Sequence, residues 1–334
     1  MPILAVHSFE NNIFNISLIP DFVVLILTFV FLKWIYFAKI FQMISIIISS
    51  TNHIFLENVT KNIAETIGVI FEIISFNNAD GGKGLSELYN EGAKRAKYDL
   101  ICFMHEDVNI KTENWGIVVA NIFEQNQKVG LIGLAGSSYK TLVPSGWFCD
   151  AGAKITNYVN MLQRYKFSET ETKLVYQNPK GSISAKVTSV DGVWFCTKKS
   201  IVAEHPFDGK LFQKFHCYDL DFSFSVSLSY DVVVTFEILL EHFSEGNYDR
   251  TWVEETLKLH EKWSHYFPLD NDGLSKKEKN IAEKYSFRVF IKQMLTVGYS
   301  RFEIFKIFWN SYLRKQNFSL FFKLMKEICR TQIS

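Results

Sequence analysis

Short apolar runs alternate with amphipathic segments along the first part of the chain. Four runs rich in β-branched residues indicate buried strands, at 44–50, 69–75, 100–104 and 129–135. The segments between them repeat apolar residues at helical spacing, at 58–67, 85–96 and 115–124. Such alternation is typical of strands that run parallel, with helices on the faces of their sheet. We therefore predict an α/β fold with a mostly parallel central sheet flanked by helices.

Polar side chains follow the first three predicted strands. These strands end in Ser49-Ser50, Asn77-Asn78 and His105-Glu106-Asp107. The carboxyl ends of parallel strands meet at one edge of a sheet, where ligands bind. The third ending joins an imidazole to two carboxylates, which together can hold a divalent cation and the phosphate that it carries. Taken alone, this segment could equally be a strand that surfaces into a polar loop.

Three further acidic residues and one histidine stand out in the second half of the chain. Asp191 lies beside Gly192 within an apolar run at 189–196, which predicts a strand. Asp219 and Asp221 lie at the start of a predicted helix, where a carboxylate can either cap the helix or act as a general base. His242 follows a predicted strand at 232–236 and could be a structural residue or a metal ligand.

Taken together, these segments resemble the family 2 glycosyltransferases, and more closely their glycosyltransferase-like branch of cell-surface polysaccharide enzymes. The resemblance covers about residues 44–246 and rests on the order and spacing of its motifs. The matching segments are Ile46-Ile47-Ile48, the helix 85–93 with Asn90-Glu91-Gly92, the DxD variant Phe103-Met104-His105-Glu106-Asp107-Val108, Val190-Asp191-Gly192, Tyr218-Asp219-Leu220-Asp221, and Glu241-His242-x-Ser244-x-Gly246.

The resemblance implies a GT-A fold, as in nucleotide-diphospho-sugar transferases, and a nucleotide-diphosphate sugar as the donor. It also implies a divalent ion, Mn²⁺ or Mg²⁺, near Asp107, with His105 or Glu106 assisting and His242 as a further ligand. By the same carry-over Asp219 is the catalytic base, and Asp221 is a neighbour that orients or caps. The positions that it assigns to the donor or acceptor pocket are Ser50, Asn78, Asp80, Asn90 and Asp191.

The function that follows is transfer of a sugar to a glycan or lipid-linked acceptor, in cell-surface polysaccharide synthesis. One base and no enzyme nucleophile predict inversion at the anomeric carbon, by direct displacement. The chain departs from the family pattern at His105, where the first acid of the DxD element is missing, and at Asn77-Asn78, where an acid is usual. The first departure motivates an alternative, a catalytically inactive relative that serves as a binding or scaffold subunit.

The N-terminal region carries an apolar segment of 17 residues at 22–38, which is at the short end of a membrane span. Lys33 interrupts the segment near its end and Lys39 follows it. The positive-inside rule would therefore place the rest of the chain at the cytoplasmic face of the membrane. An amphipathic or core helix is the alternative. We predict a hydrophobic N-terminal helix within 1–42, a glycosyltransferase domain at 43–250 and a helical C-terminal extension at 251–334.

The C-terminal extension is basic and aromatic, with thirteen Lys and Arg against four Asp and Glu from Ser275 onward. A basic amphipathic helix with aromatic residues suits a membrane surface. The same helices could instead pack on the catalytic domain, or on a second subunit of a homo-oligomer.

Overall charge and cysteine usage exclude other classes of function. The chain has 36 basic and 35 acidic residues, which argues against nucleic-acid binding. Its five cysteines form no CxxC pair, so they suit a reducing compartment and give no support for zinc.

Overall fold

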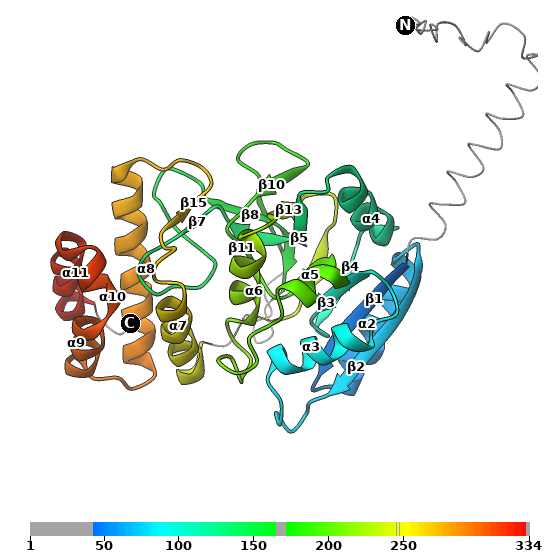
Figure 1. Ribbon diagram of the computed structural model, residues 1–334, viewed down its shortest axis with the longest axis horizontal. Helices are drawn as coiled ribbons and strands as arrows, with labels where there is room; N and C mark the ends of the chain where they lie inside the picture. Colours follow the sequence, from blue (N-terminus) through cyan, green and yellow to red (C-terminus); the bar gives the residue numbers. More distant parts are fainter. Residues whose placement is uncertain (1–42, 165–171, 245, 247, 332–334) are drawn as a thin grey trace, which may run out of the picture. The chain divides into compact units, whose positions relative to one another are not determined.

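The computed structural model describes residues 43–164, 172–244, 246 and 248–331, and every structural statement below refers to them (Figure 1). The predicted hydrophobic helix within 1–42 lies outside the described residues. Among the helices that are described, none has the length and apolar character needed to cross a membrane.

A mixed sheet of seven strands forms the centre of the fold. In spatial order these are β10 (Ser184–Lys186), β13 (Asp231–Thr235), β5 (Val129–Gly133), β12 (Trp194–Lys198), β3 (Leu100–Met104), β1 (Met43–Ser50) and β2 (Ile70–Asn77). β1 pairs in parallel with β2 and β3, and β5 pairs in parallel with β13. β12 and β10 run antiparallel to their neighbours. The predicted mostly parallel sheet is confirmed, with β12 inserted between its two parallel groups.

Helices cover both faces of this sheet. They are α2 (His53–Thr66), α3 (Leu85–Arg95), α4 (Trp115–Gln125), α5 (Lys199–Glu204) and α6 (Tyr218–Ser227). Alternate β1 side chains enter two different cores. Ile46 packs with residues of α2 and α4, whereas Ile47 packs with residues of α3, α5 and α6. A strand that is buried on both faces explains why its sequence is a continuous apolar run.

A second sheet is formed by shorter segments between and after the strands of the first one. It consists of β11 (Ser189–Val190), β6 (Ala135–Ser137), β8 (Asn157–Gln163), β14 (Leu240–His242) and β4 (Val108–Ile110), with β9 (Lys173–Gln177) also paired to β8. A short ladder joins β7 (Tyr139–Lys140) to β15 (Leu269–Asp270). Two predicted strands are therefore divided between the sheets. The run 129–135 becomes β5 and β6, and the run 189–196 becomes β11 and β12.

The C-terminal part is helical, as predicted. It contains α7 (Arg250–Lys262), α8 (Lys276–Thr296), α9 (Arg301–Asn310), α10 (Tyr312–Gln316) and α11 (Phe318–Arg330), and Figure 1 shows α8, α9 and α11 side by side. Ser275 and Ser300 begin α8 and α9 with capping boxes. These helices share one hydrophobic core with Leu142, Phe212 and Phe224 from earlier in the chain. The extension thus packs on the first part of the fold, while the predicted division at residue 250 stays a prediction.

Candidate active site

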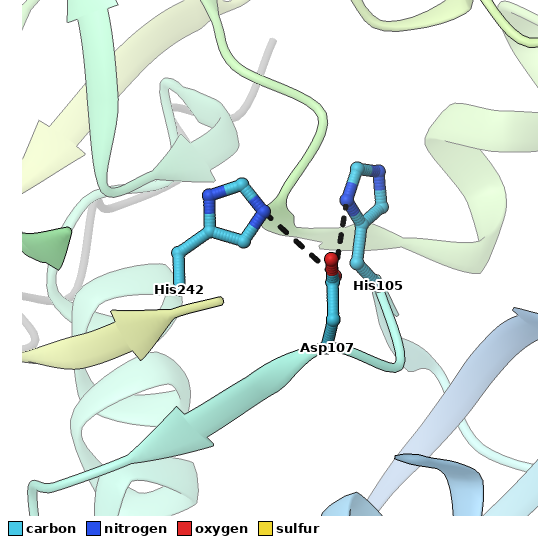
Figure 2. Close-up of side chains that lie close together, drawn as sticks. All are labelled: His105, Asp107 and His242. Atoms are coloured by element: carbon cyan, nitrogen blue, oxygen red, sulfur yellow. Dashed lines mark ion pairs between the residues drawn. The ribbon is translucent and has the colours of Figure 1, made fainter. Parts of the chain in front are cut away.

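Three side chains from two distant segments converge at the carboxyl end of β3. Figure 2 shows His105 and His242 on either side of Asp107, with a ring nitrogen of each directed at its carboxylate. Asp107 Oδ1 lies 3.8 Å from His105 Nδ1 and 3.7 Å from His242 Nε2. One ligand atom from each residue lies within 4.8 Å of the others. Two nitrogens and an oxygen at this spacing can coordinate one divalent ion.

Backbone pairing places these groups. β4 begins directly after Asp107 and pairs antiparallel with β14, so that His242 lies opposite Val108. The Phe243 amide donates to the Asp107 carbonyl at 3.0 Å, and the His105 amide donates to the Val193 carbonyl at 2.9 Å. These bonds tie the end of β3 to β14 and to the turn between β11 and β12. The sheet therefore brings the backbone positions of the three residues together.

His242 has an imidazole nitrogen without a hydrogen-bond partner. Its Nε2 atom is buried and faces Asp107 Oδ1 at 3.7 Å, which is too long for a hydrogen bond. Burial lowers the pKa of His242, with a smaller effect of His105 in the same direction, whereas Asp107 and Asp191 oppose the shift. The neutral ring is the form that ligates metals. A buried polar atom without a partner is costly in a folded protein, and a metal ion would supply that partner.

His105 is oriented by Tyr218, the first residue of α6. The Tyr218 hydroxyl lies 3.0 Å from His105 Nε2 and donates to the Gly192 carbonyl at 3.2 Å. A hydroxyl has one proton, so the Tyr218 oxygen must accept from His105 Nε2 if both bonds form. This assigns the proton of the neutral ring to Nε2 and leaves a lone pair on Nδ1, facing Asp107. An outer partner of this kind commonly fixes the tautomer of a metal-binding histidine.

Asp219 follows this tyrosine at the start of α6 and lies near enough to Asp191 for the two charges to interact. Burial and the nearby charge of Asp191 raise the pKa of Asp219 to about 7. Gly192 lets the side chains of Tyr218 and Asp219 pack directly on its backbone. A Cβ atom at this position would lie 2.2 Å from the Tyr218 hydroxyl and 3.2 Å from Asp219 Oδ2. The Asp191 carboxylate accepts from the Val193 amide at 2.9 Å, which shapes the turn that divides β11 from β12. A carboxyl group with a pKa near neutrality is suited to proton transfer.

Glu106 does not join the cluster of possible metal ligands. One carboxylate oxygen accepts from the Thr51 amide and hydroxyl, both at 2.9 Å, and from the Asn52 amide at 3.1 Å. The side chain thus links the end of β3 to the loop between β1 and α2. Asn52 in turn caps α2 through its side chain, which explains why this helix begins five residues before the predicted start.

The residues assigned to the donor pocket form hydrogen bonds mainly with backbone groups of the protein. The Ser50 carbonyl accepts from the Asn78 amide at 2.7 Å, and the Asn78 side chain bonds the Lys83 backbone. Asp80 accepts from the Gly82 amide in the same exposed loop. The Asn90 side chain makes both of its bonds to the backbone of Phe207, at 2.8 and 3.0 Å. Asn90 therefore fastens α3 to the segment before α6. Asp191 differs from the rest of this group, because its charge raises the pKa of Asp219.

Asp221 points to α7 and not to Asp219. It accepts from Trp263 Nε1 at 2.7 Å and pairs with Lys262 Nζ at 2.7 Å. Burial raises its pKa, against the opposing effect of Lys262. This residue connects α6 with the C-terminal helices, and its capping or orienting role at the catalytic site stays a prediction.

Sequence reasoning missed Tyr218 as a site residue. The residue lies inside the motif Tyr218-Asp219-Leu220-Asp221, but only the two acids of this motif were predicted to act at the site. Phe215 was also missed, although its ring lies 5.6 Å from that of His105 and is half exposed. The aromatic residues before Asp219 were the signal that could have pointed to both.

Comparison with known proteins identifies the family. The family model described as "Glycosyltransferase like family" matches residues 45–267, which is more than half of the chain. The chain therefore belongs to this glycosyltransferase family. The predicted family, the GT-A fold and the enzyme class of glycosyl transfer are confirmed at this level. Among curated proteins, no sequence matches the chain.

Several solved structures are similar to the fold at low sequence identity. GalNAc-T7 with UDP, GalNAc and Mn²⁺ is 11% identical at a TM-score of 0.47, and covers 83% of this chain. The chain spans only 56% of the GalNAc-T7 chain. S. aureus TarS 1–349 is 10% identical at a TM-score of 0.43, covering 86% of this chain and 80% of its own. Its complex with UDP-GlcNAc is also 10% identical, at 0.41, covering 87% and 92%. Likeness at TM-scores below 0.5 says nothing about what this chain binds.

Proposed function

We propose that the chain transfers a sugar from a nucleotide-diphosphate donor to a glycan or lipid-linked acceptor, with inversion, in cell-surface polysaccharide synthesis. The observation that carries this proposal is the convergence of His105, Asp107 and His242 in a member of a glycosyltransferase family. The leaving group of such a reaction is a nucleoside diphosphate, whose negative charge a bound cation would neutralise.

The donor atoms of the cluster favour Mn²⁺ over Mg²⁺. Mg²⁺ prefers oxygen ligands and keeps much of its water, whereas imidazole nitrogens suit transition metals. The cluster supplies two imidazoles and one carboxylate. His105 also provides a ligand at the position where the usual acid of the motif is missing. The departure from the family motif is thus compatible with a complete set of three protein ligands.

Asp219 is the proposed base. Its raised pKa reflects burial and the charge of Asp191, so that the ionised form is a stronger base than an exposed aspartate. A base positioned at the acceptor hydroxyl contributes about 10²- to 10⁴-fold in rate. Asp221 is held by Lys262 and Trp263, so one carboxylate at this helix start is left for the acceptor. A single base without a nucleophile supports inversion.

Nucleotide release by the purified full chain tests the function. The donors are UDP-, GDP- and TDP-sugars, with CMP-sugars as the monophosphate comparison, each with Mn²⁺, Mg²⁺ or EDTA. We expect one nucleoside diphosphate to be released, and we expect this release to require Mn²⁺. In His242→Ala, release should fall about 10²-fold or more, because the charge of the leaving diphosphate loses its partner.

His265→Ala is the matched control, since His265 is exposed and lies outside the cluster. Release that is equal with EDTA and with Mn²⁺ would contradict the metal assignment. No release and no thermal shift with any nucleotide would favour the inactive binding or scaffold subunit instead.

A further inference from the structure

An aromatic patch lies on the outer side of α9 and α11. It consists of Phe302, Phe305, Trp309, Phe318 and Phe322, all of which are exposed. Phe302 is 76% exposed, Phe318 63% and Trp309 40%. Single exposed apolar residues are ordinary on protein surfaces, but a group of five large rings on two adjoining helices calls for an explanation.

Ring contacts connect the patch across the two helices. Phe305 stacks on Trp309 at 5.4 Å, and Trp309 contacts Phe321 at 5.8 Å. Phe321 contacts Phe322 at 5.4 Å, and Phe322 contacts Phe318 at 4.6 Å. Phe302 lies one helical turn before Phe305 on the same side of α9. The rings therefore form one surface, joined at its centre by the buried Phe321.

The fold does not need these rings for its own core. α9 already packs through Ile304 and Phe308, and α11 packs through a full stripe that includes Leu324 and Ile328. An amphipathic helix needs one apolar stripe to pack on its own protein. The exposed aromatic residues form a second apolar face, which is free to contact a binding partner.

Cations outnumber acidic residues on the helices that carry the patch. Residues 301–330 contain seven Lys and Arg but only two Asp and Glu. The two acids are engaged, since Glu303 is part of the α9 capping box and Glu327 is buried against Arg288 and neighbouring cations. The cations at the rim, which we call the basic rim, are Lys306, Arg314, Lys315, Lys323 and Lys326. Arg314 itself lies over the Trp309 ring, 4.8 Å from its centre.

We propose that this aromatic patch and its basic rim dock on the surface of an anionic lipid bilayer. Phenylalanine and tryptophan side chains enter the boundary between headgroups and acyl chains, while Lys and Arg pair with anionic headgroups. A second copy of this chain is a poor occupant, because an isologous contact would press two basic rims against one another. The proposal goes beyond sugar transfer and does not depend on it.

Hydroxyl-radical footprinting of the full chain reads this surface residue by residue. The probe is vesicles of phosphatidylcholine, with and without phosphatidylglycerol. We expect oxidation of Trp309, Phe318 and Phe322 to slow several-fold with anionic vesicles and to stay unchanged with neutral ones. Because the readout is local, anchoring of the protein by residues 1–42 would not produce it.

Charge reversal tests the rim. In Lys323→Glu/Lys326→Glu, protection at a fixed lipid concentration should disappear, and the lipid needed for half-protection should rise about tenfold or more. Lys61→Glu/Lys94→Glu makes the same change in net charge on the exposed faces of α2 and α3 and should keep the protection. Circular dichroism checks that both variants fold.

Three results would overturn the proposal. The first is unchanged oxidation of the patch with anionic vesicles, whether or not the protein sediments with them. The second is equal protection by neutral and anionic lipid. The third is protection that appears without lipid as the protein concentration rises, which would identify a second copy as the occupant.

Discussion

Two regions of the molecule bury ionisable groups, and the regions differ in the hydrogen-bond partners that these groups have. At the end of β3, His242 Nε2 is buried without a hydrogen-bond partner and Asp219 lies close to a second carboxylate. Under the C-terminal helices, buried Lys140 donates to the Ser145 carbonyl at 2.6 Å, the Ser145 hydroxyl at 2.9 Å and the Gly146 carbonyl at 2.9 Å. Buried Glu283 accepts from the Leu142 and Val143 amides.

The comparison shows that a shifted pKa does not by itself mark a functional site. Burial lowers the pKa of Lys140 to about 7 and raises that of Glu283 to about 7. The first shift is as large as that of Asp219, and the second is somewhat smaller. Structural networks of buried groups shift pKa values as active sites do. What separates the two regions is whether their buried polar atoms have partners. Lys140 and Glu283, which with their partners we call the helix network, bond protein atoms, whereas His242 Nε2 in the cluster at β3 has no such partner.

Asp219→Asn should have the largest effect on catalysis. We expect kcat to fall about 10²- to 10⁴-fold, because the amide cannot accept the proton of the acceptor. In the wild type, kcat/KM should rise with pH through about 7 as Asp219 ionises, and this rise should be absent from the variant. Steady-state kinetics across pH measures both.

The same substitution should not lower the stability of the protein above pH 7, although it lowers kcat. The raised pKa of Asp219 gives stability that is complete below the unfolded value of about 3.9 and is lost as pH rises through about 7. At pH above 7, Asp219→Asn should therefore melt no lower than the wild type. Asp99→Asn, at an exposed position, is the matched control. A variant that loses activity only in proportion to its folded fraction would contradict the assignment of Asp219 as the base.

Tyr218→Phe tests the orientation of His105. Removing the hydroxyl leaves His105 Nε2 without its partner, and we expect metal affinity to fall about 10- to 100-fold. Mn²⁺ titration of the purified protein measures the change. Tyr230→Phe is the control, because its hydroxyl bonds the surface residue Glu204. Equal Mn²⁺ affinity in Tyr218→Phe and the wild type would show that the tyrosine serves α6 alone.

Glu283→Gln tests the helix network, where we expect a change in stability and none in metal affinity. Gln has one acceptor oxygen in place of two, so a backbone amide of Leu142 or Val143 loses its bond, at about 1–3 kcal/mol of unfolding free energy. The raised pKa of Glu283 gives stability that is complete below the unfolded value of about 4.3 and is lost as pH rises through about 7. The cost of the variant should therefore be greater at pH 5 than at pH 8.

Chemical denaturation at the two pH values measures this change, with Glu261→Gln on the exposed side of α7 as the control. A greater loss at pH 8 than at pH 5 would contradict the assigned direction of the shift. A loss of Mn²⁺ affinity with intact folding would join the two regions into a single site.

Local patterns in the sequence predicted most of the fold. The apolar run of β1 predicts a buried strand because both of its faces are covered. The insertion of antiparallel β12 between β3 and β5 was beyond that reasoning, since the pairing joins residues about ninety and sixty positions apart. Motif order brought Asp107 and His242 into one proposed site. It did not predict the role of Tyr218, which depends on a hydrogen bond to His105, 113 residues earlier in the chain.

Contacts between distant parts of the sequence also explain why Asn90 and Glu106 have other partners than the sequence predicted. The partners of Asn90 are backbone atoms 117 residues away, and those of Glu106 are backbone and hydroxyl groups 54 and 55 residues away. No local pattern encodes such bonds. A carboxylate next to Asp107 therefore resembled a metal ligand in the sequence, although the fold uses it to hold a loop.

Glu106→Gln is the prediction with the smallest expected effect, and it sharpens the boundary of the metal cluster. Gln keeps one acceptor oxygen for Thr51 and Asn52 but loses the charge, so we expect about 1 kcal/mol less stability. Because its carboxylate is bound to that loop, Mn²⁺ affinity should stay unchanged. The matched comparison is Asp107→Asn one residue later, which should weaken Mn²⁺ binding strongly. If the two variants lose Mn²⁺ to the same degree, Glu106 turns toward the ion when it binds and the cluster has four protein ligands.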